Sequence, residues 1–321
     1  MNTAWESIAC ILNLRIRIMQ MRPLISICIP TYNRADVLEI CINKIVGDKV
    51  FGKEIEIVVS DNCSTDNTEN LMLKYSAQFN NIKYYRQKRN IGGERNFIFV
   101  LEHGSGELLK LHNDYSIFTE NGLTLLLNIV RSNRNAKPLL FFSNEKPSNT
   151  IFCENMNEFV EHSRMSTTWI GNYGYWREDF LQLPNKDEKI DTQFMQLDWF
   201  FRIMERKVSC FIYEDEYSTR FKFKSNQGGY NMFEVKTTKY FSIYQPYINS
   251  GLILEDSFSK LKREVYKNLV GWFYIIYIRK DKHFDFSSKN ALPLIYKYFH
   301  KYLWFYTDPF KFFIEKIVAR R

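Results

Sequence analysis

Short runs of branched apolar residues alternate, in the first half of the chain, with longer segments in which apolar residues recur every three or four positions. The runs cover residues 24–29, 54–60, 82–85, 107–111 and 139–143. Their length and their content predict buried strands. The segments between them predict helices over 33–47, 65–75, 94–103 and 121–132. Strands that alternate with such helices predict an α/β fold, a Rossmann-like and mostly parallel sheet flanked by helices.

Polar residues cluster directly after each of the first four predicted strands. The clusters lie at 31–34, 61–66, 86–96 and 112–114. Since parallel strands joined by right-handed crossovers end at one edge of their sheet, and ligands bind there, we expect the four clusters to meet. Any one of them alone would be a routine turn.

The regular alternation fades after residue 145, and this predicts four parts. A leader over 1–21, with an apolar piece followed by arginines, is not ordered like a secretion signal and is expected to be outside the core. We predict a ligand-binding half over 22–145 and a second half over 146–255. The segments 258–278 and 292–319 predict a helical appendage over 256–321 that is rich in aromatic and basic residues.

Composition excludes several protein classes. With 45% apolar and 25% charged residues, the chain is neither collagen-like nor intrinsically disordered. The longest uncharged stretch, 240–254, is shorter than the ~20 apolar residues of a bilayer span, which excludes a polytopic membrane protein. The cysteines form no zinc-type pairs, so we expect reduced, buried thiols.

Most of the net charge of +8 belongs to the C-terminal segment. Residues 257–321 hold 14 Lys/Arg against 5 Asp/Glu, whereas the rest of the chain is nearly neutral. Lysines and arginines alternate there with aromatic residues, a pattern typical of a helix that lies on an anionic bilayer. The alternative is a helix packed on the protein itself. Because no matching basic patch occurs elsewhere, we expect no nucleic-acid partner. The residues concerned are Tyr296, Lys297, Tyr298, Phe299, Lys301, Tyr302, Trp304, Phe305, Phe310, Lys311, Phe312, Phe313, Lys316, Arg320 and Arg321.

The polar clusters contain side chains suited to a nucleoside diphosphate. Asp61 can accept hydrogen bonds from a base or a ribose, or it can cap the following helix. Arg86, Lys88, Arg89 and Arg95 can meet phosphate charge, or they form a solvated basic turn. Asp114 follows a strand directly and suits Mg²⁺ or Mn²⁺, or it closes a turn.

Four motifs resemble, in order and spacing, those of the family 2 glycosyltransferases, which have the GT-A fold. Residues 30–34 (PTYNR) resemble the family's opening motif, and 58–66 (VVSDNCSTD) resemble its nucleotide-binding loop. Residues 90–96 (NIGGERN) resemble the third motif. Residues 106–114 lie where the family has its D-x-D metal motif, with His112 in place of the first carboxylate.

The resemblance implies a site for a nucleotide-diphosphate sugar. It implies that Asp61 contacts the base, that Arg95 approaches the diphosphate, and that Asp114, with a possible contribution from His112, holds Mn²⁺ or Mg²⁺. The residues expected to bind the donor are Pro30, Thr31, Tyr32, Arg34, Asp61, Asn62, Asn90, Gly92, Arg95, His112 and Asn113.

The resemblance also implies a catalytic base near the start of a helix in the second half. Asp198, with Arg202 one turn later, is our candidate, and Asp191 is the reserve. The alternative is that Asp198 is an ordinary helix residue. Trp169, Tyr173 and Trp176, with Asn172 and Tyr175 beside them, are expected to form an acceptor wall that stacks on sugar rings, or else to pack in the core.

The resemblance thus implies an inverting glycosyltransferase of surface-polysaccharide synthesis, such as capsule, O-antigen or exopolysaccharide. It also implies a UDP-sugar as donor and a glycan or a lipid-linked glycan as acceptor. We expect a cytoplasmic protein, peripheral on the inner membrane through its C-terminal tail. The alternatives are a nucleotidyltransferase of similar topology and a non-catalytic module that binds carbohydrate or membrane.

Overall fold

The computed structural model describes residues 22–144, 148–221, 227–281 and 284–318. They form two compact units. The first comprises the described residues up to Lys137 together with Tyr173–Gln182 and Glu216–Phe221. The second comprises Pro138–Asn172, Leu183–Asp215 and the described residues from 227 onward. The chain therefore returns to the first unit twice, whereas the sequence pattern predicted a single boundary between the two halves, near residue 145. The predicted leader lies outside the described residues.

The first unit contains an α/β sheet with its flanking helices. Its strands are β1 (Ile25–Thr31), β2 (Ile55–Asp61), β3 (Ile82–Arg86), β4 (Leu108–Leu111), β5 (Ser116–Phe118), β8 (Tyr173–Trp176) and β10 (Ser218–Arg220). Its helices are α2 (Ala35–Val46), α3 (Thr68–Gln78), α4 (Gly93–His103), α5 (Gly122–Asn133) and α7 (Arg177–Leu181).

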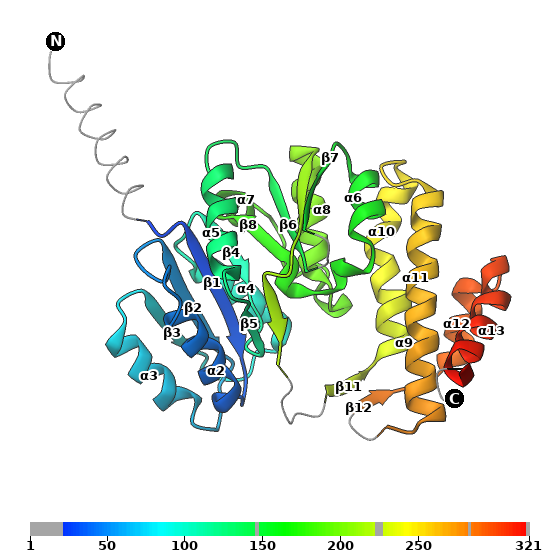
Figure 1. The fold of residues 1–321 in the computed structure, drawn as a ribbon, viewed down its shortest axis with the longest axis horizontal. Helices are drawn as coiled ribbons and strands as arrows, with labels where there is room; N and C mark the ends of the chain where they lie inside the picture. The colour runs from blue at the N-terminus through cyan, green and yellow to red at the C-terminus, as the bar shows by residue number, and fades with distance from the viewer. Residues whose placement is uncertain (1–21, 145–147, 222–226, 282–283, 319–321) are drawn as a thin grey trace, which may run out of the picture. The chain divides into compact units, whose positions relative to one another are not determined.

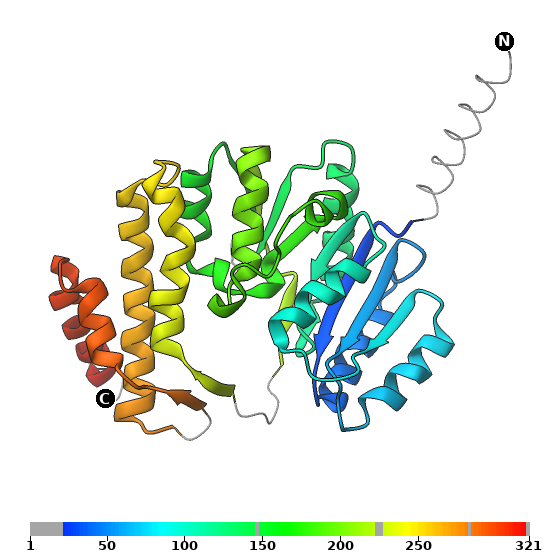
Figure 2. The same ribbon diagram turned by 180° about the vertical axis from the view of Figure 1, so that it is seen from behind.

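The strands of this sheet follow the order β3-β2-β1-β4-β8. Strands β1 to β4 run parallel, and β8 is antiparallel to β4. The chain runs outward from β1 through β2 to β3, and then crosses back past β1 to form β4. Right-handed crossovers therefore place α2 and α3 on one face and α4 on the other, as Figures 1 and 2 show from opposite sides.

Strand β1 is two residues longer at its carboxyl end than predicted. Pro30 and Thr31 continue the ladder opposite Ser60 and Asp61 of β2. Proline has no N–H to donate to a neighbouring strand. Strand β4 pairs with β1 only as far as Cys28, so the β1–β4 ladder requires no hydrogen bond from residue 30. The predicted strand end at Pro30 is therefore wrong, and Thr31 is held rigidly at the end of the strand.

Helix α2 shows how far periodicity predicts burial. The apolar pattern over 33–47 predicts one face with Leu38, Ile40, Cys41 and Ile45. Leu38, Cys41 and Ile45 are buried, and the helix ends at Gly47. Ile40 is 47% exposed, and Ile42 is buried in its place. With 100° between successive residues, a buried stripe through 38, 41 and 45 contains position 42 and leaves out position 40.

The second unit contains three paired strands and most of the remaining helices. Strands β6 (Leu139–Ser143) and β9 (Cys210–Glu214) run parallel, and β7 (Asn149–Cys153) is antiparallel to β9. A second ladder joins β11 (Gln227–Asn231) to β12 (Phe284–Ser287). The helical segments are α6 (Met156–Ser163), η1 (Arg164–Thr168), η2 (Ile170–Asn172), η3 (Ile190–Thr192), α8 (Met195–Lys207), α9 (Met232–Glu234), η4 (Val235–Lys239), α10 (Tyr240–Asn249), α11 (Glu255–Phe273), η5 (Tyr274–Ile278), α12 (Ala291–Phe299) and α13 (Leu303–Val318).

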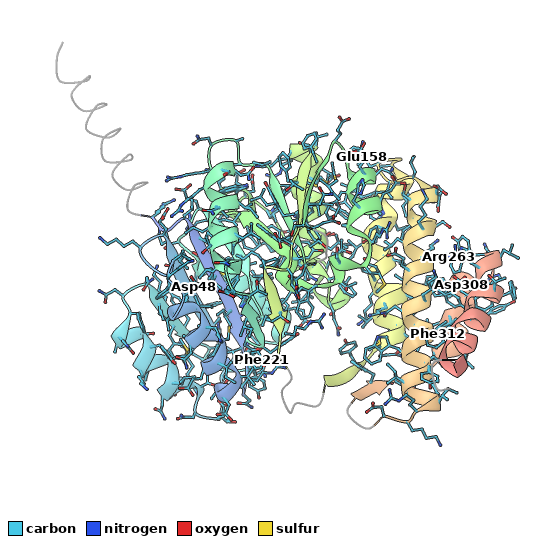
Figure 3. The ribbon with its side chains drawn as sticks, in the orientation of Figure 1. Asp48, Glu158, Phe221, Arg263, Asp308 and Phe312 are labelled. Atoms are coloured by element: carbon cyan, nitrogen blue, oxygen red, sulfur yellow. The ribbon has the colours of Figure 1, made fainter. Side chains whose placement is uncertain are left out.

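The segment predicted as a helical appendage, 256–321, contains α11, η5, α12 and α13, and both α12 and α13 pack on α11. Helices α12 and α13 are separate because the chain turns between Phe299 and Leu303, a break that the sequence pattern did not predict. Arg263 of α11 binds Asp308 of α13 through two hydrogen bonds of 2.8 and 2.9 Å (Figure 3). Tyr266 donates to the carbonyl of Phe305 at 2.7 Å. The side chains at 310, 311, 313–318 and 319–321 lie outside the described part.

Two exclusions made from composition can be compared with the structure. Cys28, Cys41, Cys153 and Cys210 are buried and free, as predicted, and Cys63 is half-buried. Within the described ranges, no helix has both the length and the apolar character needed to cross a bilayer.

Candidate functional site

The polar clusters after β1, β2 and β4 meet at one edge of the sheet. Thr31 and Asp61 end their strands side by side, and Arg86 ends β3 next to them. The Thr31 hydroxyl donates to Asp114 Oδ2 at 2.9 Å, which joins the end of β1 to the loop after β4. We call the side of the sheet marked by Thr31, Asp61 and Asp114 the carboxyl edge.

Asp61 is completely buried at this edge, with both oxygens engaged. Oδ1 accepts from the backbone N–H of Ser64 at 2.8 Å, and Oδ2 accepts from the Tyr84 hydroxyl at 2.8 Å. Arg86 Nε lies 3.7 Å from Oδ2. A nucleobase that contacts Asp61 therefore has to displace at least one of these three partners. The cap of the following helix, the alternative role for Asp61, is provided by Asp66, which accepts from the N–H of Thr68 at 3.0 Å.

Asn62 fixes the loop that precedes α4. It donates to Asn90 Oδ1 at 2.9 Å and accepts from the N–H of Ile91 at 2.8 Å. Gly92 follows with φ of 88°, a backbone conformation that side chains with a Cβ rarely adopt. Asn90, Gly92 and Arg95 are exposed. The first turn of α4, with the Arg95 side chain, is thus held beside the end of β2.

Asp114 is buried and bound on both of its oxygens. Oδ2 accepts from Thr31, and Oδ1 forms an ion pair with Arg34 Nη1 at 3.0 Å. Burial raises the pKa of Asp114, while the Arg34 charge and the hydrogen bonds from Thr31 and Arg34 lower it. The Arg34 guanidinium also lies over the ring of Tyr115, 5.5 Å from its centre. Arg34 is therefore fixed between Asp114 and Tyr115.

The two residues before Asp114 are also buried. His112 Nε2 lies 3.0 Å from the carbonyl oxygen of Ser116, which can only accept, so Nε2 carries the proton. The His112 ring stacks on Phe118, and burial, followed by the charge of Lys110, lowers its pKa to about 3. Asn113 is 7% exposed, and among the residues that the structure describes its amide Nδ2 has no hydrogen-bond acceptor. A buried donor without an acceptor is costly, so this amide is suited to an acceptor atom on a ligand.

These donors fit a divalent cation poorly. Mg²⁺ in proteins takes one or two carboxylates, besides substrate oxygens and water. Asp114 is the single carboxylate of the motif, and Arg34 and Thr31 already occupy it. Across the ranges described above, no three His, Cys, Asp or Glu side chains are grouped so that they could hold a metal ion. The predicted metal at Asp114 and His112 stays a prediction with little support from the geometry.

Lys110 is a buried cation in β4 that the sequence analysis did not single out. Its Nζ lies 3.2 Å from the carbonyl oxygen of Leu111 and 3.3 Å from the Tyr217 hydroxyl. Burial lowers its pKa to about 7. His112 follows β4 directly and its N–H still bonds to the Cys28 carbonyl of β1, so Lys110 and His112, two residues apart, project from the same face.

The candidate base Asp198 lies in the second unit, in the first turn of α8. It is buried, and Oδ2 accepts from Arg202 Nη1 at 3.3 Å. Burial raises the pKa of Asp198, whereas Arg202 lowers it. A raised pKa makes a carboxylate a better proton acceptor. Arg202 also donates to the carbonyl oxygens of Pro184 and Asn185, which fixes it beside Asp198.

The remaining predicted residues are placed less favourably. Asp191, the reserve base, is exposed in η3. Tyr173 and Trp176 of β8 have almost no exposed surface, so their rings pack in the core, the alternative that the sequence left open. Trp169 is partly exposed and packs on Gly171 of the second unit. Of the three predicted acceptor residues, we retain Trp169.

Two tyrosines at the carboxyl edge were missed from sequence. Tyr84 holds Asp61, and Tyr115 supports Arg34. Alternation in β3 carries a signal for the first: Tyr84 pairs with Val59, two residues before Asp61, which places both side chains on one face. Tyr115 lies in the turn between β4 and β5, where no periodicity indicates its direction.

Comparison with known proteins finds a family and several relatives. A model of the family described as glycosyl transferase family 2 matches residues 26–197. Abequosyltransferase RfbV of Salmonella typhimurium is 36% identical over 104 residues, 32% of this chain and 31% of that protein. The GalNAc(5)-diNAcBac-PP-undecaprenol beta-1,3-glucosyltransferase of Campylobacter jejuni is 30% identical over 106 residues, 33% of this chain and 34% of that protein. The chain thus spans about a third of the length of these curated relatives.

The fold is also found among solved structures. The mannosyltransferase PcManGT from Pyrobaculum calidifontis, solved in complex with GDP-Man and Mn²⁺, superposes with a TM-score of 0.53 at 16% sequence identity. The match covers 77% of this chain and 70% of that chain. This likeness confirms the predicted GT-A fold, a mainly parallel sheet flanked by helices.

Proposed function

Because this chain belongs to glycosyl transferase family 2, we propose that it moves a sugar from a nucleotide-diphosphate donor to a hydroxyl group of a glycan. One observation carries the proposal: Thr31, Arg34 and Asp114 meet in one hydrogen-bonded group at the carboxyl edge. Ligands of parallel α/β sheets bind at this edge.

The proposed donor site combines two arginines and a tyrosine that have exposed surface with one buried amide. Arg34 and Arg95 present cations for the diphosphate, and Asn113 Nδ2 supplies a hydrogen-bond donor. Tyr32, 43% exposed after β1, offers a ring face to the base. A UDP-sugar is the proposed donor. Asp61, Asn62, Asn90, Gly92 and His112 support the loops around it.

The proposed reaction is a single displacement that inverts the sugar carbon. The acceptor oxygen forms a bond to the anomeric carbon as the bond from that carbon to the diphosphate oxygen breaks. Asp198 takes the proton from the acceptor hydroxyl, and the nucleoside diphosphate leaves with the bonding electron pair. A positioned base of this kind contributes typically ~10²–10⁴-fold in rate.

The proposed acceptor is a glycan on a lipid carrier, in synthesis of a surface polysaccharide. The Campylobacter relative carries an undecaprenol-linked acceptor in its name. In this chain, α12 and α13 expose Leu292, Tyr296, Leu303 and Tyr306. Lys297 is exposed on α12, and Lys301 is exposed in the turn between the two helices. Apolar and aromatic side chains interleaved with lysines suit an anionic bilayer. We place this surface on the cytoplasmic face of the inner membrane.

Donor binding and product release together test the proposal. Melting temperature is measured with UDP-, GDP-, CDP- and dTDP-sugars, because a ligand that binds only the native state raises it. The sugar nucleotide that raises it is then incubated with a lipid-linked glycan, and release of free nucleoside diphosphate is followed. Release supports a transferase. Binding without release supports the non-catalytic module, and pyrophosphate formed from a nucleoside triphosphate and a sugar phosphate supports the nucleotidyltransferase.

A further inference from the structure

We infer that Arg34 supplies, in this chain, the positive charge at the donor diphosphate, so that donor binding needs no metal ion at Asp114 and His112. The inference rests on the proposed function, because it concerns how the same donor is held. It departs from the metal that the family resemblance implied, and three features of the carboxyl edge support it.

The first feature is the occupation of Asp114. The Thr31 hydroxyl and the Arg34 guanidinium bind its two oxygens at 2.9 and 3.0 Å. Its side chain is 3% exposed. A metal ion at this buried carboxylate would lie beside the Arg34 guanidinium and would compete with it and with Thr31 for the two oxygens.

The second feature is the direction of His112. The family motif has a carboxylate at this position, whereas here a buried imidazole donates Nε2–H to the Ser116 carbonyl at 3.0 Å. The ring is nearly parallel to Phe118, with 4.7 Å between ring centres. The position therefore offers a metal one imidazole nitrogen at most and adds no negative charge.

The third feature is the availability of Arg34. Its side chain is 36% exposed, twelve times the fraction exposed by Asp114, so an incoming diphosphate meets the cation first. Asp114 on one side and the Tyr115 ring on the other fix the guanidinium in place. A fixed planar cation with several N–H donors is well suited to phosphate oxygens.

The test on the unaltered protein is calorimetric titration with UDP, GDP, CDP and dTDP, once in EDTA and once in Mn²⁺. We expect one nucleotide to bind in EDTA with a dissociation constant within about twofold of the value in Mn²⁺. Binding that appears only with Mn²⁺, or tightens by more than about tenfold with it, overturns the inference and leaves the proposed function intact. No binding in either condition overturns both.

A double variant tests the role of Arg34 directly. Arg34→Ala with His112→Asp removes the guanidinium and restores two carboxylates at 112 and 114. We expect nucleotide affinity in EDTA to fall by about ten- to a hundredfold, and Mn²⁺ to restore much of it, with protein-bound Mn²⁺ visible by electron paramagnetic resonance. Unchanged affinity in EDTA would overturn the inference. Arg131→Ala, which changes an exposed arginine of α5 paired with Glu54, is the matched control. If the double variant does not fold, the titration of the unaltered protein decides alone.

Discussion

The carboxyl edge of the first unit and the segment from Trp169 to Asp198 were both assigned from sequence, but on different grounds. At the edge, the assignment followed from topology: polar residues come after parallel strands, and such strands end together. In the later segment it followed from residue types and a looser resemblance. The structure brings Thr31, Arg34 and Asp114 together as topology requires. It buries Tyr173 and Trp176 of the later segment. Topology is thus the better guide to which side chains meet.

The largest expected effect tests the later segment. Asp198→Asn keeps the shape of the side chain and removes its ability to take a proton, so we expect kcat to fall ~10²–10⁴-fold with donor affinity unchanged. Steady-state kinetics with donor and acceptor measure both quantities. Asp191→Asn, at an exposed position, is the matched control and should leave kcat unchanged. If the two results were exchanged, Asp191 would be the base and α8 would have only a structural role.

The second prediction concerns a buried lysine of strand β4, which lies between β1 and β8. The pKa of Lys110 is about 7 in the folded protein and is near 10.5 when the chain is unfolded. Between pH 7 and pH 10 the unfolded chain holds the extra proton, so stability rises with pH by about 1.4 kcal/mol per unit from this group. Below pH 7 both states are protonated and the contribution stays constant.

Urea unfolding at pH 7, 8 and 9 measures this dependence. The free energy of unfolding of the natural protein should rise with pH relative to Lys110→Met, which has no proton to bind at this position. Lys44→Met, at an exposed lysine of α2, is the control and should follow the natural protein. A constant difference between the natural protein and Lys110→Met would show that Lys110 keeps its proton when buried.

The third prediction concerns a residue that topology could have revealed. Tyr84→Phe removes the hydroxyl that donates to buried Asp61. The loss of one hydrogen-bond donor to this buried carboxylate should lower the free energy of unfolding by about 1–3 kcal/mol. Denaturant unfolding measures the change, and Tyr85→Phe, one residue along the same strand, is the comparison. Equal stability of both variants would mean that Arg86 and the Ser64 N–H are enough to stabilise the buried Asp61 carboxylate.

The smallest expected effect concerns the amide of Asn113. Its Nδ2 has no acceptor in the described structure, and a donor nucleotide is expected to supply one. Asn113→Ala should therefore raise the dissociation constant of the donor by about tenfold with kcat unchanged. Asn128→Ala, on an exposed face of α5, should bind as the natural protein does. Unchanged affinity in Asn113→Ala would remove this residue from the donor site.

Much of the first unit could be predicted from sequence because its signals are local and repeated. Buried strands such as β2 are continuous apolar runs, and Gly47 ends α2 where the pattern stops. The strand that returns to this sheet, β8, could not be predicted in the same way. Its residues are aromatic, and an aromatic run reads equally well as a core strand or as an acceptor wall.

The partners of individual side chains were the least predictable part of the site. The position of Asp114 was found from its place after a strand, whereas its ion pair with Arg34 joins residues eighty positions apart. Sequence spacing alone could not choose between a metal ion and an arginine as the cation at Asp114. The His112 substitution was visible in sequence, but its consequence depends on the Ser116 carbonyl, which only the folded loop brings near.

A crystal structure with a bound nucleoside diphosphate, grown without divalent metal, tests the central claim most directly. The account predicts that the diphosphate lies at the ends of β1 and β4, with phosphate oxygens on Arg34 and an acceptor atom within hydrogen-bond distance of Asn113 Nδ2. A nucleotide bound at any other surface, with the Thr31–Asp114–Arg34 group untouched, would contradict it.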